Sequence, residues 1–289
     1  MDLLLHIGAH RTGTTAMQDM LAANRAVLEA AGISALVHAD LEREVRGFAR
    51  IPRREGWDGI RARLDAATEG AAQVLISDEN MIGDMGWNIR SGSFYWRAKK
   101  KLEAYRDFFA ADPRRIGLGI RSYESYWISA HAIELTYRDV TKDGVVRFDE
   151  ARAGMAGALR GWRDLVADIR AVFPASEILV WPVEAALPVG RIMARLTGMD
   201  LPLTPPPQKV NAAPDARLIP AMEDKRAAEP GLRRAAMWDW LKTQAPRPFA
   251  GFDEDQRAHM AERYAADLAA LEQGFAGAEL LAHVEPGAA

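Results

Sequence analysis

The chain of 289 residues has no cysteine, which excludes disulfide bonds, thiolate nucleophiles and cysteine-based zinc sites. It also has no HExxH motif, no histidine pair at metal-binding spacing and no aspartate-rich calcium loop, so no metal is expected. No stretch approaches the ~18 uninterrupted apolar residues of a membrane helix, and no basic segment precedes the short apolar start. The sequence therefore predicts a cytoplasmic protein without a membrane span.

A large excess of charge of one sign is missing too. Lysine and arginine number 37 against 40 acidic residues, which gives a formal net charge of −3. Such a balance argues against nucleic acid as a partner, although a local basic cleft can still attract a small anion. The composition, 49% hydrophobic and 27% charged, is typical of a globular protein, and nothing in it predicts an oligomeric state.

What the chain does have is an alternation of short apolar runs with longer amphipathic stretches. This alternation predicts an α/β fold with a mainly parallel sheet covered by helices. The expected strands cover residues 2–8, 33–37, 72–77, 114–120 and 176–181. The expected helices cover residues 14–30, 57–69, 94–110, 122–137 and 148–172, because apolar positions recur there every three or four residues.

The last third of the chain has a different pattern. The proline-rich stretch 201–216 predicts a loop, and two or three helices without any further strand are expected after it. We therefore expect a single domain over residues 1–289, with a parallel α/β core in 1–200 and a helical C-terminal portion in 217–280. A short tail of alanine, glycine and proline, 285–289, ends the chain.

The first expected strand runs into the loop G-A-H-R-T-G-T-T, residues 8–15. Its glycines have the G-x-x-x-x-G spacing of a phosphate-binding P-loop, but Thr14 stands where such loops have a lysine. Because that lysine reaches the β- and γ-phosphates of a nucleotide, its absence argues against a kinase or NTPase, which stays an alternative. The loop amides, the hydroxyls of Thr14 and Thr15 and the dipole of the following helix suit an anion.

The string HIGAHRTGTTAMQ resembles the 5′-phosphosulfate loop, P-K-[ST]-G-T-[TS], of the sulfotransferases that use 3′-phosphoadenosine 5′-phosphosulfate (PAPS). His10 replaces the proline of that motif and Arg11 replaces its lysine, which keeps the positive charge on a larger, planar group. The resemblance implies that the phosphosulfate is bound by His10, Arg11, Thr12, Gly13, Thr14 and Thr15. It further implies that Arg11 offsets charge on the leaving oxygen.

A second segment, LGIRSYESYWISAH, supplies a cation and a hydroxyl after the fourth expected strand. Arg121 and Ser129 stand eight residues apart, and the sulfotransferases use an arginine and a serine at this spacing for the 3′-phosphate of PAPS. Ser122 and Tyr123 replace the variable residue and the proline that usually follow that arginine. Ligands of parallel sheets bind at the carboxyl ends of strands, so both anion-binding segments are expected at one edge.

The third expected strand ends in VLISDEN, which places two acids at the same edge. A glutamate in similar S-x-E-N patterns follows this strand in bacterial and Golgi-type sulfotransferases, so the resemblance implies that Glu79 is the general base. A carboxylate in a partly buried cleft suits this role, because burial raises its pKa. Asp78 and a histidine stay alternatives, and the alternation of side chains along a strand turns only one of the two acids towards the donor.

In the sulfotransferases a late loop closes over the nucleotide, and Lys209 and Asn211 are the corresponding candidates here. The resemblance as a whole implies a three-layer parallel sheet of the P-loop NTPase or sulfotransferase type. The expected reaction moves a sulfuryl group from PAPS to a hydroxyl or amine of a small-molecule or carbohydrate acceptor, leaving 3′-phosphoadenosine 5′-phosphate (PAP). A non-catalytic adenine-nucleotide-binding protein is the other alternative, and the sequence does not identify the acceptor.

Overall fold

The computed structural model describes residues 1–137, 144–205 and 213–282, and its described strands form one sheet of six parallel strands. The order across the sheet is β2-β3-β1-β4-β5-β6. The strands are β1 (Asp2–His6), β2 (Ile33–Val37), β3 (Gln73–Ser77), β4 (Arg115–Ile120), β5 (Glu177–Pro182) and β6 (Ala278–Leu280). The predicted α/β class and parallel sheet are confirmed. Four of the five predicted strands contain a strand of the structure, and the fifth, 176–181, overlaps β5, which ends one residue later.

The prediction that no strand follows the proline-rich loop is wrong, because β6 pairs with β5 at the edge of the sheet. Three residues are too few for a periodic pattern, so the sequence gives no signal for this strand. The pairing is supported from outside the strand: Nε of Arg170 donates to the carbonyl oxygen of Ala276 at 2.7 Å, just before β6 begins. The backbone groups at the edge of β5 are the hydrogen-bonding partners of β6.

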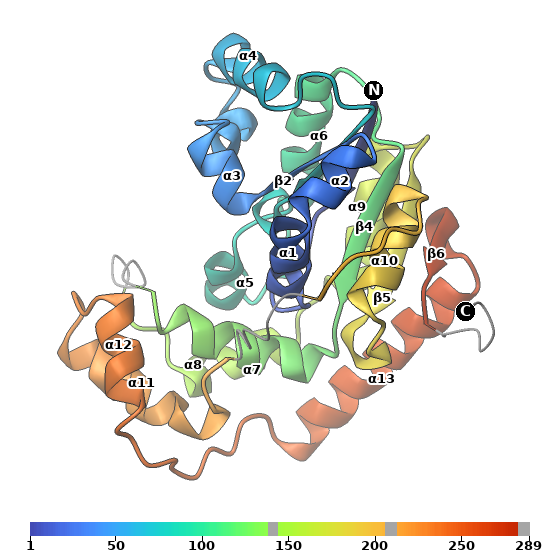
Figure 1. Ribbon diagram of the computed structural model, residues 1–289. Coiled ribbons are helices and arrows are strands. Elements are labelled where there is room, and N and C mark those ends of the chain that lie inside the picture. Colours follow the sequence, from blue (N-terminus) through green and yellow to red (C-terminus); the bar gives the residue numbers. More distant parts are fainter. Residues whose placement is uncertain (138–143, 206–212, 283–289) are drawn as a thin grey trace.

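Helices cover both faces of the sheet (Figure 1). One face carries α1 (Thr14–Ala23), α2 (Arg25–Ala30) and α10 (Val189–Thr197), whose apolar side chains pack around Leu4 and Leu75. The opposite face carries α6 (Ala98–Phe109) and α9 (Trp162–Val172), which pack around Leu5 and Ile76. Residues 4 and 5 point to opposite faces because side chains alternate along a strand.

The remaining helices lie around this core. They are α3 (His38–Arg43), α4 (Trp57–Ala67), α5 (Met85–Ser91), α7 (Tyr123–Glu134), α8 (Phe148–Ala156), α11 (Ile219–Ala228), α12 (Arg234–Leu241) and α13 (Glu254–Glu272). The long α13 runs along α7, α8 and α9 to reach β6. None of the helices in the described ranges is both long and apolar enough to cross a membrane.

Two predicted helices are divided in the structure. The helix predicted over 14–30 breaks at Asn24, whose side-chain amide donates to the carbonyl of Met20 at 2.8 Å and so competes with the helical backbone. The helix predicted over 148–172 breaks at 157–161. A Cβ on Gly161 would lie 2.1 Å from the hydroxyl oxygen of Tyr123, so only glycine permits this close approach.

The strand order creates a crevice at the carboxyl edge of the sheet. From the neighbouring strands β1 and β4, the chain leaves in opposite directions: β1 leads through α1 and α2 to β2, and β4 leads through α7, α8 and α9 to β5. The loops after β1 and β4 therefore separate, which is the position where open parallel sheets bind ligands. Both anion-binding segments predicted from the sequence lie at this point.

Candidate functional site

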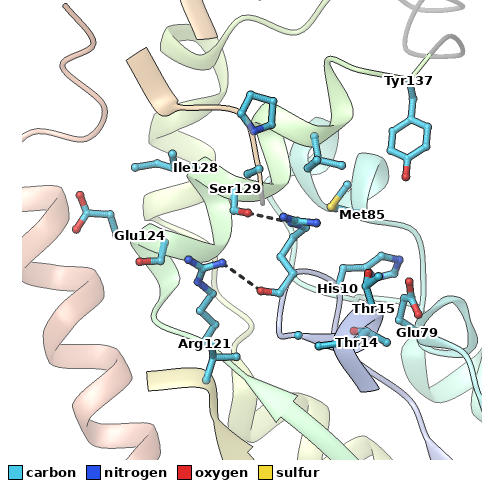
Figure 2. Close-up of a pocket in the computed structure, with 18 of the residues that line it drawn as sticks. His10, Thr14, Thr15, Glu79, Met85, Arg121, Glu124, Ile128, Ser129 and Tyr137 are labelled. Atoms are coloured by element: carbon cyan, nitrogen blue, oxygen red, sulfur yellow. Dashed lines mark hydrogen bonds between the residues drawn. The ribbon is translucent and has the colours of Figure 1, made fainter. Parts of the chain in front are cut away.

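A cavity of about 840 Å³ opens at the carboxyl edge, within the size range of small-molecule sites. Its walls come from the loop and helix after β1, from Glu79 and Met85, and from the first turns of α7. Ala213, Pro214 and Arg234 of the C-terminal portion add a further wall. Figure 2 shows the side chains of His10, Thr14, Thr15, Glu79 and Arg121 gathered around this space.

The loop after β1 depends on glycine at two positions with positive φ, Gly8 at +100° and Gly13 at +85°. Gly8 also lies close to the turn that carries Glu79, because a Cβ there would be 2.7 Å from the Cβ of Glu79. Gly13 stands at the N-cap position of α1, and no side-chain hydrogen bond caps this helix. Gly13 and the first residues of α1 line the cavity, so the backbone amides of this turn and the helix dipole suit an anion there.

The threonines of the loop differ in what they face. The hydroxyls of Thr12 and Thr14 both donate to the carbonyl oxygen of Ala9, at 2.6 and 2.9 Å. Thr12 is buried and does not line the cavity, whereas Thr14 and Thr15 do. In the structure the hydroxyl protons of both Thr12 and Thr14 thus hold the loop, and Thr12, for which the resemblance implied a ligand contact, does not reach the cavity.

Arginines from three segments converge on the cavity. Nε of Arg11 donates to Oγ of Ser129 at 2.9 Å, and Arg121 donates to the backbone carbonyl of Arg11 at 3.2 Å (Figure 2). Arg234, the first residue of α12, lines the same cavity. Burial, followed by the nearby charges of Arg121 and Arg234, lowers the pKa of the Arg11 guanidinium. A cluster of like charges of this kind favours a bound anion.

The two acids at the end of β3 face different surroundings. Glu79 lines the cavity, and its Oε2 accepts a hydrogen bond from Nε2 of Gln18 at 3.0 Å. Asp78 is buried beside His38, with Oδ1 and Nδ1 3.3 Å apart, and lines a different, smaller cavity. Only Glu79 therefore lies where the predicted base has to act.

The Asp78–His38 contact is an ion pair. Burial alone would raise the pKa of Asp78, but the hydrogen bond and charge of His38 lower it below its ordinary value. In return, the hydrogen bond to Asp78 raises the pKa of His38 to about 9. A carboxylate held in this pair is a poor general base, which separates the role of Asp78 further from that of Glu79.

Arg121 and Ser129 lie where the sequence placed them, just after β4 and inside α7. Ser129 is largely buried, and its hydroxyl oxygen accepts the Arg11 bond on the cavity side. Lys209 and Asn211, the candidates for a closing loop, lie outside the described residues. Nothing in the described ranges groups three or more histidine, cysteine or acidic residues for a metal ion.

Several residues of the site were not predicted. Gln18 follows Thr15 by three residues on α1, so helical spacing could have placed it beside the loop. Arg234 and Tyr137 gave no such signal, because they meet only in the folded chain, with the guanidinium 4.5 Å from the ring centroid. Tyr95, whose ring stacks on His10 and whose hydroxyl contacts it, is likewise far in sequence from the loop.

The chain was compared with models of protein families, with curated proteins and with solved structures, and none of the three comparisons found a match. The function is therefore argued from the cavity and its side chains.

Proposed function

We propose that the protein is a PAPS-dependent sulfotransferase with a fold of the P-loop NTPase or sulfotransferase type. The proposal assigns the 5′-phosphosulfate to the loop after β1 and the N-terminus of α1. It assigns the 3′-phosphate to Arg121 and Ser129, and the proton of the acceptor to Glu79. The acceptor is a small molecule or carbohydrate with a hydroxyl or amine.

The observation that carries the proposal is the 2.9 Å contact between Nε of Arg11 and Oγ of Ser129. Two segments 118 residues apart, each resembling one phosphate-binding motif of the sulfotransferases, meet through this contact in one cavity. Arg121 joins the same group through the carbonyl of Arg11. A donor with anionic groups at both the 5′ and 3′ positions of its ribose would use all three side chains. AMP and ADP have no 3′-phosphate, so they would not use Arg121 and Ser129.

The reaction follows from these positions. The carboxylate of Glu79 accepts the proton of the acceptor hydroxyl, whose oxygen forms a bond to the sulfur of PAPS. The bond between the sulfur and the bridging oxygen to the 5′-phosphate breaks in line with this attack, and PAP leaves. Negative charge grows on the bridging oxygen, where Arg11 and the amides of α1 stabilise it, and preorganised charge of this kind is usually the largest catalytic contribution.

Thermal unfolding with PAP, AMP and Mg·ATP tests the proposal. A ligand at 100 times its dissociation constant stabilises a protein by ~2.7 kcal/mol, so saturating PAP should raise the melting temperature clearly and AMP much less. Arg121→Ala should remove most of the PAP effect. Arg152→Ala is the matched control, because that arginine lies on α8, 3.7 Å from Asp149, and does not line the cavity.

Stabilisation by Mg·ATP alone would refute the proposal in favour of phosphoryl transfer. Stabilisation by PAP without transfer from PAPS to any of a panel of sugars, phenols and amines would instead indicate a nucleotide-binding protein that is not an enzyme.

A further inference from the structure

A chain of hydrogen-bonded side chains runs behind the anion loop and passes through His10. Its members, in order, are Asn88, Tyr126, Tyr95, His10, Asn80 and Asp78. The positions of the protons along the chain follow from which atoms can donate and which can only accept. The Asp78 end of the chain fixes that direction, and the hydrogen bonds at the Asn88 end are compatible with it.

The first end is set by the backbone of Tyr95. Its N–H donates to Oδ1 of Asn88 at 3.0 Å, so Nδ2 of Asn88 donates to the hydroxyl oxygen of Tyr126 at 2.8 Å. The Tyr126 hydroxyl donates in turn to the Tyr95 oxygen at 3.2 Å, which also accepts the backbone N–H of His10 at 3.1 Å. In this arrangement both lone pairs of Tyr95 are used, and its own proton points at Nδ1 of His10, 2.9 Å away. The Asn88 end is thus compatible with Nδ1 as an acceptor.

The second end is set by the Asp78 carboxylate, which can only accept. Its Oδ1 accepts from the backbone N and from Nδ2 of Asn80, at 3.0 and 2.8 Å, which fixes the orientation of the Asn80 amide. Oδ1 of Asn80 then faces Nε2 of His10 at 3.4 Å. An amide oxygen cannot donate, so the proton of this contact belongs to Nε2. The Asp78 end thus gives the tautomer of His10 with its proton on Nε2, and the bond to Tyr95 accommodates it.

The charge of the His10 ring is consistent with these hydrogen bonds. An imidazolium would need a proton on Nδ1, where the Tyr95 hydroxyl already directs its own. Burial lowers the pKa of His10, against the opposing effects of the charge of Glu79, the hydrogen bond to Asn80 and the charges of Asp84 and Asp78. Burial also raises the pKa of Tyr95, so that its hydroxyl keeps its proton. Both the hydrogen bonds and the burial therefore favour the neutral ring of His10.

We propose that His10 is a neutral hydrogen-bond donor to the bound anion, with its proton held on Nε2 by the positioning residue Tyr95. The identity of that anion rests on the proposed function, whereas the tautomer does not. His10 lines the cavity beside Thr15 and Glu79 (Figure 2), and its contact with Asn80 is long enough for a ligand oxygen to replace it at little cost. The same assignment removes His10 from the candidate bases, because Nδ1 is occupied and Nε2 already carries a proton.

The tautomer is tested on the protein alone, by nitrogen NMR with histidine labelled in the ring. The His10 signals, identified by their loss in His10→Gln, should show a protonated Nε2 and an unprotonated Nδ1 between pH 7 and 8. In Tyr95→Phe the donor to Nδ1 is gone, and the ring should titrate or show both tautomers. A wild-type His10 with a protonated Nδ1, or one that titrates near an ordinary histidine pKa, would overturn the proposal.

The donor role is tested by the affinity of wild type, His10→Gln and His10→Ala for PAP at pH 6 and pH 8. Glutamine supplies a neutral N–H and should stay within a few-fold of wild type, whereas alanine should lose roughly tenfold or more. The ratio of wild type to His10→Ala should be the same at both pH values, because titration of PAP itself cancels. A ratio that grows as the pH falls would show an imidazolium and refute the neutral donor, as would an unchanged affinity in His10→Ala.

Inorganic pyrophosphate is measured in parallel. If it binds with the expected ratios while PAP does not bind wild type, the proposed function fails and the role of His10 stands. If PAP binds but His10→Ala changes neither affinity, the role of His10 fails and the proposed function stands. Failure of both anions to bind overturns both.

Discussion

Replacing Gly8 by alanine should destabilise the protein much more than the same change at Gly13, although both glycines belong to one loop and both have positive φ. At Gly13 the added Cβ meets nothing within 4 Å, so the cost is that of an alanine in a left-handed conformation, ~1–2 kcal/mol. At Gly8 the same backbone cost applies, and the new Cβ would also lie 2.7 Å from the Cβ of Glu79 and 3.2 Å from its Cα. Forcing atoms into such a contact costs a further ~1–3 kcal/mol.

The expected losses of unfolding free energy are therefore ~1–2 kcal/mol for Gly13→Ala and ~2–5 kcal/mol for Gly8→Ala, from the sum of the two costs. Urea denaturation of both variants measures them, with equal slopes as the condition for comparing midpoints. Because relief of the Gly8 contact pushes the loop and the Glu79 turn apart, Gly8→Ala should also weaken the stabilisation by PAP. Equal destabilisation by the two variants would refute the close approach of the loop to Glu79.

Three further predictions concern the charged groups. Glu79→Gln should abolish sulfuryl transfer while PAP still stabilises the fold; transfer at the wild-type rate would remove Glu79 as the base. Arg11→Ala should lower turnover by orders of magnitude, measured with saturating PAPS once an acceptor is found, and a change below threefold would contradict its role at the leaving oxygen. His38→Gln should cost stability at pH 6 and little at pH 9.5. Hydrogen bonding to Asp78 raises the pKa of His38 above its unfolded value of 6.5 to about 9, so the stabilisation is complete below pH 6.5 and lost as the pH rises through 9. Since His38 is 40% exposed, screening reduces the effect to about 1 kcal/mol, and denaturation of both proteins at the two pH values measures it.

The parts of the fold that the sequence predicted correctly are those in which a local pattern is decisive. The buried strands β1 to β5 each contain a short run of mainly apolar residues, and such a run can be recognised without knowledge of the neighbouring strands. The break at Gly161 escaped prediction because its cause lies in Tyr123. At Asn24 the local bond to Met20 is joined by a bond from the backbone N–H of Thr204, which no local pattern indicates. Strand β6 escaped for the same reason, since its pairing depends on the edge of β5.

The candidate site divides in the same way. The motifs predicted Arg11, Glu79 and Ser129 at one edge of the sheet, because the carboxyl ends of parallel strands lie at the same edge. Spacing could not distinguish the two acids after β3. That choice depends on His38, which pairs with Asp78 and leaves Glu79 on the cavity side.

The two departures of the loop from the sulfotransferase pattern have the same explanation. A lysine has donors only at Nζ, whereas Arg11 contacts Ser129 through Nε, one of the five N–H donors of a guanidinium. A proline in place of His10 would have neither the backbone N–H nor the ring that Tyr95 binds. Each departure thus has a matching partner, 118 residues away for Arg11 and 85 for His10. Arg11→Lys would therefore remove the Nε donor to Ser129, and His10→Pro would remove both hydrogen bonds to Tyr95. The residues of the loop thus depend on Ser129 and Tyr95.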